Sequence, residues 1–344
     1  MGVKRYGWNM ITISLCMIVK NEEKILERCL SCVADLMDEI IIVDTGSSDR
    51  TKEIARKYTD KIYDFEWVND FAAARNYAFS KATKGYIYSA DADEVLDKVN
   101  RERFHLLKQN LLPEIEIVQM YYSNQLQFGS VYNYDREYRP KLFKRIRNFT
   151  WIDPIHETVR TKALVFDSEI EIIHEQEESH AARDLEAFRR ACGEERLSQR
   201  LHNLYARELF IAGEKEDFLE AEEFFEASCN DTQRSAEEVK EAACVTAKAA
   251  RLRGDKLKFH KYAMKVIASE GCSEICMELG NFYKKEKDYA EAAVWFYNAA
   301  FETESLLDIR SKGDKPLLGL AECYRCLGME EQAKEYQKMA GEWR

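Results

Sequence analysis

Apolar and polar positions follow two patterns in turn along the first half of the chain. Four apolar, mostly β-branched runs predict buried strands, at residues 11–19, 39–44, 61–65 and 85–89. Three stretches with apolar positions at helical spacing predict helices, at residues 21–30, 50–58 and 71–83. Because strands and helices that alternate at this spacing form βαβ units, we expect a Rossmann-like α/β domain with a mostly parallel sheet.

After about residue 180 the strand patterns stop and helical hairpins follow. We expect four hairpins, with turns near Gly213, Gly254, Lys287 and Gly328. The last two have the small and large positions of a tetratricopeptide repeat, at Leu279, Gly280, Tyr283, Ala292, Phe296 and Ala299, and at Leu320, Ala321, Tyr324, Gly328, Ala333 and Ala340. A generic helical bundle is the alternative. The predicted domains are therefore residues 1–180 (α/β) and 181–344 (all-α, tetratricopeptide-like repeats).

Composition and charge limit the classes of function. The chain has 344 residues, of which 46% are hydrophobic and 33% are charged, as in a globular protein. Its formal net charge is −11, with −3 on residues 1–175 and −8 on residues 176–344. A broad nucleic-acid footprint needs a basic surface, so we expect no nucleic-acid partner.

The cysteines and the longest apolar run indicate the compartment. Ten cysteines are scattered through apolar stretches, which is typical of buried thiols in a reducing cytoplasm. The pairs Cys29/Cys32 and Cys323/Cys326 have metal-like spacing, but no His or Cys cluster lies nearby to complete a zinc site. The apolar run at 11–19 is too short to span a bilayer. We expect a cytoplasmic protein without a membrane span.

Acidic motifs follow two of the predicted strands. Asp91-Ala-Asp93-Glu94 comes after the strand at 85–89, and Asp44-Thr-Gly-Ser-Ser-Asp49 comes after the strand at 39–44. Ligands of such sheets bind at the carboxyl ends of the strands, and clustered carboxylates there are usually neutralised by Mg²⁺ or Mn²⁺. An Asp-x-Asp at this place suits a diphosphate–metal clamp, although an exposed acidic turn is the alternative. Neither GxGxxG nor GxxxxGK[ST] occurs, which disfavours a dinucleotide-binding fold and a P-loop NTPase.

Taken together, the ordered motifs of the first half resemble a known family. They are Ile18–Glu22, Val43–Asp49, Asp70–Asn76, Asp91–Glu94, Arg139–Lys144, Trp151–Glu157 and His174. This set resembles a family 2 glycosyltransferase with a GT-A fold. With the helical region behind it, the chain is similar to bacterial protein S-glycosyltransferases, which modify cysteines of bacteriocin peptides (glycocins).

The resemblance implies roles for individual residues. Asp44 would accept a hydrogen bond from the uracil N3–H. The nucleotide-sugar pocket would be lined by Val19, Asn21, Glu22, Asp44, Gly46, Ser47, Asp70, Arg75, Asn76, Asp91 and Arg139. Mn²⁺ or Mg²⁺ would be held by Asp93, Asp91 and His174, although His174 could also be an ordinary surface histidine at a strand end.

The same resemblance implies a catalytic base that deprotonates the acceptor. Glu157 occupies the place of the family's acidic base, and His156 beside it is the alternative, since a neutral imidazole suits a thiol or hydroxyl acceptor.

We therefore expect an inverting, metal-dependent hexosyltransferase of the EC 2.4 class. It would move a hexose from a UDP-sugar, UDP-glucose in the first instance, to a Cys or Ser/Thr side chain of a peptide or protein that docks on the helical repeats. A homodimer formed through the helical region is also implied. Two alternatives remain: transfer to a cell-envelope glycan or lipid carrier, and a non-enzymatic repeat adaptor with a degenerate transferase domain.

Overall fold

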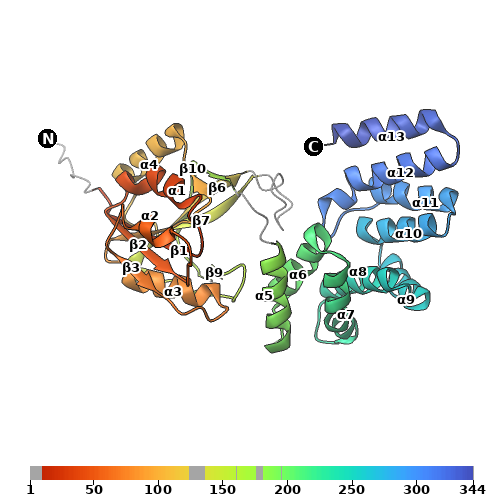
Figure 1. The fold of residues 1–344 in the computed structure, drawn as a ribbon, viewed down its shortest axis with the longest axis horizontal. Coiled ribbons are helices and arrows are strands. Elements are labelled where there is room, and N and C mark those ends of the chain that lie inside the picture. The colour runs from red at the N-terminus through yellow and green to blue at the C-terminus, as the bar shows by residue number, and fades with distance from the viewer. Residues whose placement is uncertain (1–9, 124–135, 160, 176–180, 195, 344) are drawn as a thin grey trace, which may run out of the picture. The chain divides into compact units, whose positions relative to one another are not determined.

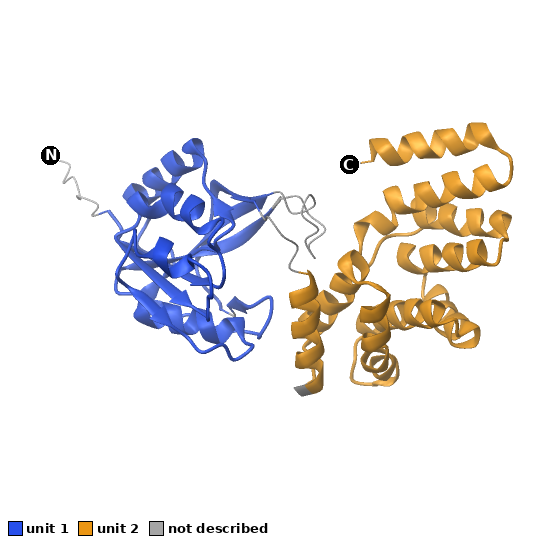
Figure 2. Ribbon diagram, viewed as in Figure 1, with its two compact units in different colours: residues 1–179 blue, residues 180–344 orange. Residues whose placement is uncertain are grey.

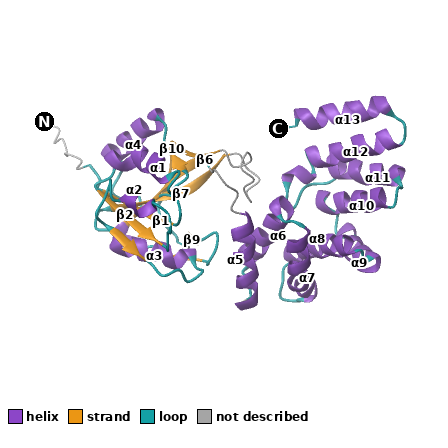
Figure 3. Ribbon diagram, in the orientation of Figure 1, coloured by secondary structure: helices purple, strands orange, loops and turns teal. Residues whose placement is uncertain are grey.

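The computed structural model describes residues 10–123, 136–159, 161–175, 181–194 and 196–343. The chain divides into two units, residues 1–179 and 180–344 (Figures 1 and 2). Residues 176–180, which include the expected boundary, lie outside the described residues. Within the described residues, the strands belong to the first unit and the second unit is helical (Figure 3).

Ten strands and four α-helices lie in the described residues of the first unit. The strands are β1 (Ile13–Val19), β2 (Glu39–Asp44), β3 (Ile62–Asp64), β4 (Tyr86–Ser89), β5 (Glu94–Val95), β6 (Ile117–Ser123), β7 (Arg136–Lys144), β8 (Trp151–Ile152), β9 (Thr158–Val159) and β10 (Val165–His174). The helices are α1 (Leu26–Val33), α2 (Thr51–Ala55), α3 (Phe71–Lys81) and α4 (Lys98–Asn110), with short 3₁₀ turns η1 (Ala34–Leu36) and η2 (Arg145–Arg147).

Eight of these strands form one sheet, in the order β3-β2-β1-β4-β7-β6-β10-β5. The pairs β2/β3, β1/β2, β1/β4 and β6/β10 are parallel, whereas β4/β7, β6/β7 and β5/β10 are antiparallel. The four predicted strands are confirmed as β1 to β4. The mostly parallel sheet confirms the expected α/β class.

Helices cover both faces of the sheet because successive strand residues point to opposite sides. Leu15 and Met17 of β1 pack in a core with α1, α2 and α4. Cys16 of β1 and Ile41 of β2 point the other way and pack against α3. Burial on both faces explains why these strands read as continuous apolar runs.

Two predicted helices are shorter than the sequence pattern indicates. The expected helix at 21–30 begins only at Leu26, because Asn21 has a left-handed backbone (φ 57°) and residues 20–25 form a loop. The expected helix at 50–58 is confined to Thr51–Ala55. In the first case the missing turn is replaced by the loop that follows β1, and in the second residues 56–58 form a turn ahead of β3.

The second unit contains nine α-helices within the described residues. They are α5 (Ala181–Glu194), α6 (Gln199–Ala212), α7 (Lys215–Asn230), α8 (Ala236–Arg253), α9 (Lys256–Ile267), α10 (Ser273–Lys285), α11 (Tyr289–Tyr297), α12 (Asp314–Cys326) and α13 (Glu330–Glu342), with a π-helical turn η3 (Asn298–Glu302) and a 3₁₀ turn η4 (Ile309–Ser311).

The four predicted hairpin turns are confirmed. Gly213 lies between α6 and α7, Gly254 between α8 and α9, Lys287 between α10 and α11, and Gly328 between α12 and α13. Gly254, Lys287 and Gly328 all have left-handed backbones, with φ of 92°, 65° and 77°. This conformation ends helices and favours glycine. Helix α5, which precedes the first hairpin, was not expected.

The small residues of the repeat pattern sit where helices approach closely. A Cβ on Gly280 of α10 would lie 2.7 Å from the ring of Phe296 in α11, and a Cβ on Gly319 of α12 would lie 2.8 Å from the same ring. Phe296 thus fills the groove between neighbouring hairpins, as the alternation of small and large positions predicts. No helix in the described part of the chain is long and apolar enough to cross a membrane.

Candidate active site

The loops after β1 and β2 meet at the carboxyl-terminal edge of the sheet. Val19 and Asp44, the last residues of these strands, are paired neighbours. Asp44 is buried, and its Oδ1 accepts hydrogen bonds from the backbone N–H of Gly46 (3.0 Å) and Ser47 (2.9 Å). Its Oδ2 is buried without a hydrogen-bond partner. Asp44 therefore fixes the turn, where Gly46 has φ 104°, and retains one oxygen that can accept a donor.

These two loops are also tied to each other. The backbone N–H of Asn21 donates to Ser47 Oγ (2.9 Å), and Asn21 Oδ1 accepts from the backbone N–H of Ser48 (2.8 Å). The backbone N–H of Glu22 donates to Thr51 Oγ1 (2.7 Å). The predicted pocket residues of the two loops, Val19, Asn21, Glu22, Asp44, Gly46 and Ser47, are thus brought together.

The acidic motif after β4 meets the end of β10. His174 Nε2 lies 2.9 Å from Asp93 Oδ2, and the backbone N–H of Glu175 donates to the carbonyl oxygen of Asp93 (2.9 Å). The other carboxylate oxygen, Asp93 Oδ1, is buried and has no hydrogen-bond partner. The structure therefore joins two predicted metal ligands that are 81 residues apart in the sequence.

Glu94, the last residue of the motif, is buried beside these groups and pairs with Lys141 of β7. Burial raises the pKa of Glu94 to about 7; Lys141 opposes this rise, whereas Asp91 and Asp93 add to it. Neither Glu94 nor Lys141 was predicted as a site residue. Both residues lie in motifs that the sequence analysis identified, Asp91–Glu94 and Arg139–Lys144. Their pairing could not be predicted, because nothing in the sequence shows that strand β7 brings Lys141 to Glu94.

Arg75 of α3 connects the acidic motif to the 151–157 loop. Its Nη2 donates to Asp91 Oδ1 (2.8 Å), its Nη1 donates to Ser89 Oγ (3.1 Å), and its Nε donates to Glu157 Oε1. The guanidinium also lies over the ring of Trp151, 5.2 Å from its centre. Burial alone would raise the pKa of Asp91, but Arg75 and Lys141 hold it well below its usual value.

Two predicted pocket residues near Arg75 have structural contacts here. Asp70 is the N-cap of α3, and its Oδ1 accepts from the backbone N–H of Ala73 (2.9 Å). Asn76 donates to the carbonyl oxygen of Trp151 (2.9 Å) and accepts from its backbone N–H (2.8 Å). The motif Asp70–Asn76 therefore holds the 151–157 loop, and Arg75 is its member that also reaches the acidic motif.

The two candidate bases lie in this loop, between β8 and β9. The backbone N–H of Phe71 donates to the carbonyl oxygen of Pro154 (2.9 Å), so α3 holds the loop at its middle as well. His156 has a left-handed backbone, with φ 46°. Such a conformation is uncommon for a non-glycine residue and is found at functional sites. Glu157 is 10% exposed and pairs with Arg75.

Arg139 lies on β7 near the end of β10. Its Nε donates to Glu137 Oε1 (2.7 Å), and its guanidinium lies 4.2 Å from the centre of the Tyr122 ring. The Tyr122 ring in turn lies 5.1 Å from the His174 ring. Arg139 is therefore placed on the same side of the site as Asp93 and His174.

The donor set fits a divalent cation. Arg75 interacts with Asp91 and Glu157, and Lys141 interacts with Asp91 and Glu94, so these two cations serve three carboxylates. The buried oxygen Asp93 Oδ1 still lacks a partner. No three His, Cys, Asp or Glu side chains of the described residues are placed to hold a metal by themselves, and Mg²⁺ commonly binds through one or two carboxylates plus substrate phosphates.

Comparison with known proteins assigns the first unit. Residues 14–171 match the family model of glycosyl transferase family 2. The chain carries a family 2 glycosyltransferase domain. The matched range begins in β1 and ends in β10, three residues before His174. The match and the mostly parallel sheet agree with the GT-A expectation.

Relatives of the chain include two bacterial proteins. A TPR repeat-containing protein of Synechococcus elongatus is 49% identical over 90 residues, which cover 26% of this chain and 22% of the relative. The SPbeta prophage-derived glycosyltransferase SunS of Bacillus subtilis is 40% identical over 92 residues, which cover 26% of this chain and 22% of the relative. The chain thus matches about a fifth of the length of each relative.

Among solved structures, the chain is similar to glucosyl-3-phosphoglycerate synthase from Mycobacterium tuberculosis in complex with Mn²⁺, UDP and glucosyl-3-phosphoglycerate. The TM-score is 0.38 at 13% identity, over 52% of this chain and 80% of that chain.

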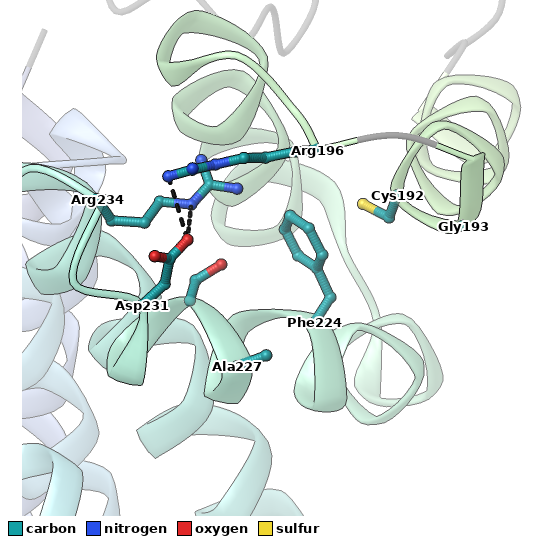
Figure 4. Close-up of a pocket in the computed structure, with 8 residues that line it drawn as sticks. Cys192, Gly193, Arg196, Phe224, Ala227, Asp231 and Arg234 are labelled. Atoms are coloured by element: carbon teal, nitrogen blue, oxygen red, sulfur yellow. Dashed lines mark ion pairs between the residues drawn. The ribbon is translucent and has the colours of Figure 1, made fainter.

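The helical unit has a cavity of about 360 Å³ between α5, α7 and the turn that follows α7. Arg196 and Arg234 point toward Asp231, while Phe224 and Cys192 lie across from them (Figure 4). Arg196 Nη2 is 3.1 Å from Asp231 Oδ2, and Arg234 Nη1 is 2.6 Å from Glu238 Oε1. Because each of these arginines pairs with a carboxylate, the cavity presents no excess positive charge to a ligand.

Proposed function

We propose that the protein is an inverting, metal-dependent hexosyltransferase that uses a UDP-sugar and glycosylates a peptide or protein side chain. The observation that carries the proposal is the pair of Asp93 and His174, beside the motif residue Asp91, at the end of a region that matches family 2 glycosyltransferases. Ligands of open α/β sheets bind at this edge.

The donor side of the proposed reaction rests on the loops after β1, β2 and β4. Asp44 Oδ2 is the acceptor that a uracil imide N–H requires. Asp93 and Asp91 would hold Mn²⁺ or Mg²⁺ together with the donor diphosphate, and His174 orients the Asp93 carboxylate. When bound, the cation would offset the negative charge of the departing diphosphate.

On the acceptor side, the 151–157 loop supplies the base. Glu157 is proposed to remove the proton from the attacking thiol or hydroxyl, with His156 as the alternative in the same loop. Arg75 orients the Glu157 carboxylate, and α3 holds the loop through Asn76 and Phe71. A base fixed in this way does not lose freedom of motion during the reaction.

We assign acceptor docking to the helical repeats. Hairpin repeats form extended surfaces that suit peptides. The glycosyltransferase SunS is a relative by sequence over part of both chains. We therefore propose a peptide acceptor, with Cys or Ser/Thr as the modified residue. The ten cysteines of the chain itself are free thiols, as in a reducing compartment, and we place the reaction in the cytoplasm.

The test is incubation of the protein with UDP-glucose, Mn²⁺ and a panel of peptides that contain Cys, Ser or Thr, followed by mass spectrometry. A hexose adduct on a peptide, absent when EDTA is added, supports the proposal. Hydrolysis of the UDP-sugar without any peptide adduct would redirect the search to glycan and lipid-carrier acceptors. If no UDP- or GDP-sugar gives either an adduct or hydrolysis, the non-enzymatic adaptor is the remaining alternative. Size-exclusion chromatography of the same sample tests the proposed homodimer.

A further inference from the structure

We propose that Arg75 is the positioning residue of the site, and that it couples the carboxylate on the donor side, Asp91, to the carboxylate on the acceptor side, Glu157. The inference rests on the proposed function and adds a residue that links its two halves. Its basis is geometric, because one guanidinium makes directed contacts to both carboxylates at once.

Arg75 gathers groups from two other parts of the chain, residues 89–91 and the 151–157 loop. Asp91 and Ser89 lie 16 and 14 residues from it along the sequence, and Glu157 lies 82 residues away. The side chain is only 11% exposed, and its face packs over Trp151. An arginine held on several sides has little freedom to move, so the positions of Asp91 and Glu157 relative to each other depend on it.

Only an arginine can fill this role in full. Its planar guanidinium carries donors in a fixed fork, and here Nε and Nη2 each serve one carboxylate while Nη1 serves Ser89. A lysine offers the same charge from a single point and cannot hold both carboxylates in one geometry. Charge and geometry can therefore be separated by substitution.

The charge of Arg75 also has a direct effect on cation binding. Because Arg75 neutralises Asp91, it competes with a divalent cation for that carboxylate and repels the cation. Removing the guanidinium should strengthen the binding of Mn²⁺, even though it damages the reaction. General structural damage at the site would change Mn²⁺ affinity in the opposite direction.

The experiment measures the binding of Mn²⁺ alone, by calorimetry, to the wild-type chain and to the variants Arg75→Gln and Arg75→Lys. We expect Arg75→Gln to bind Mn²⁺ about tenfold more tightly, the size of a Coulomb term between these charges in water. Arg75→Lys, which keeps the charge, should bind as the wild type does. Arg56→Gln, which removes an exposed arginine of the same unit, is the matched control and should change nothing.

Turnover with UDP-glucose and a peptide acceptor then tests the geometry. We expect Arg75→Lys to lower kcat at least tenfold while the donor KM changes less than threefold. Since Arg75 acts through Glu157, the double variant Arg75→Lys/Glu157→Gln should be no slower than Glu157→Gln alone. Circular dichroism shows whether each variant is folded. If Arg75→Gln is not folded, the kinetics of Arg75→Lys test the proposal.

Several results would overturn the proposal. Weaker Mn²⁺ binding by folded Arg75→Gln would show a structural role only. A double variant that loses the product of the two single losses would show that Arg75 and Glu157 act separately. If the wild type binds Mn²⁺ but turns over no sugar nucleotide, the proposed function fails, while the Mn²⁺ affinities still decide the role of Arg75. A wild-type chain that binds no Mn²⁺ overturns both.

Discussion

At the scale of single residues, the two oxygens of Asp93 have different surroundings. Oδ2 lies 2.9 Å from His174 Nε2, and Oδ1 is buried without a hydrogen-bond partner. A buried carboxylate oxygen that accepts nothing is costly, so it is expected to acquire a partner in the working protein. Because other carboxylates lie near Asp93, a cation is the partner that the local charge favours.

This leads to a prediction for Asp93→Asn, which keeps the shape of the side chain and removes its charge. We expect Mn²⁺ affinity to fall at least tenfold and turnover of the UDP-sugar to fall on the order of 100-fold, because a charged ligand of the cation is lost. Calorimetry and a UDP-release assay measure the two quantities. Asp60→Asn, at an exposed acid of the same unit, serves as the control. Wild-type turnover in Asp93→Asn would falsify the metal role.

A second residue-scale feature lies in the helical unit. Burial raises the pKa of Glu208 to about 8, and Asp184 of α5 raises it further, while Arg183 opposes the rise. Between the unfolded pKa of 4.5 and this value, the folded chain binds more protons at this carboxyl than the unfolded chain does. The contribution of Glu208 to stability is therefore complete below pH 4.5 and declines as the pH rises toward 8.

We accordingly predict that Glu208→Gln is more stable than the wild type at pH 8.5, and that the difference shrinks as the pH is lowered to 5. The difference in the free energy of unfolding between the two proteins should change by no more than about 1.4 kcal/mol per pH unit. Urea unfolding at pH 5, 7 and 8.5, followed by circular dichroism, measures it. A difference in the free energy of unfolding that stays constant across this range would contradict the assignment.

Motif order predicted many of the residues that the structure brings together, but not the contacts that each one makes. Asp70 and Asn76 are expected to line the nucleotide pocket, and the structure shows in addition that Asp70 caps α3 and Asn76 holds Trp151. Their partners could not be foreseen, because Trp151 is 75 residues from Asn76 and only the fold brings the two together.

At the scale of elements, strand β7 shows why some strands of the sheet could not be predicted from the hydrophobic pattern. It lies between β4 and β6, yet it contains Pro140 and Lys141. The pairing with β6 shifts between Val118 and Gln119, so that Gln119 is opposite Pro140 and Lys141 is passed over. Such a bulge tolerates a proline. The buried Lys141 is neutralised by Glu94, a partner that the local pattern does not reveal.

The hairpins, in contrast, could be predicted from local pattern because their contacts are between neighbours in sequence. Leu279, Gly280 and Phe296 lie within one hairpin, and their spacing alone indicates which helix faces meet. Lys287 was identified as a turn although it is not a glycine, and it takes the same left-handed backbone as Gly254 and Gly328.

The close approach of α11 and α12 gives an element-scale prediction. Gly319→Ala places a Cβ 2.8 Å from the Phe296 ring, and overpacking of this kind costs about 1–3 kcal/mol. Gly341→Ala in α13 is the matched control, since a Cβ there meets nothing within 4 Å and alanine favours the helix by at most about 1 kcal/mol. The free energies of unfolding in urea should thus change in opposite directions. Equal stability of Gly319→Ala and the wild type would contradict the packing described here.

At the scale of the whole molecule, each unit has an apolar core of its own. The core of the first unit lies between the sheet and helices α1, α2 and α4, and a separate cluster around Phe296 lies among α11, α12 and α13. The charge is also uneven, with −3 on residues 1–175 and −8 on residues 176–344. Two units with separate cores can carry separate parts of one reaction, which in the proposed function are sugar transfer and acceptor docking.

The last prediction separates these parts by producing residues 1–179 alone. Since the proposed donor and metal residues all lie in this unit, we expect it to hydrolyse the UDP-sugar in the presence of Mn²⁺ at a rate within about tenfold of the whole chain. For transfer to peptide, we expect the KM for the peptide to rise at least tenfold, because the proposed docking surface is absent from the fragment. Basic peptides should lose most, since their attraction to the acidic helical unit is removed, and added salt should weaken their transfer by the whole chain in the same way. A fragment that transfers sugar to basic peptides with the KM of the whole chain would show that the repeats do not bind the acceptor.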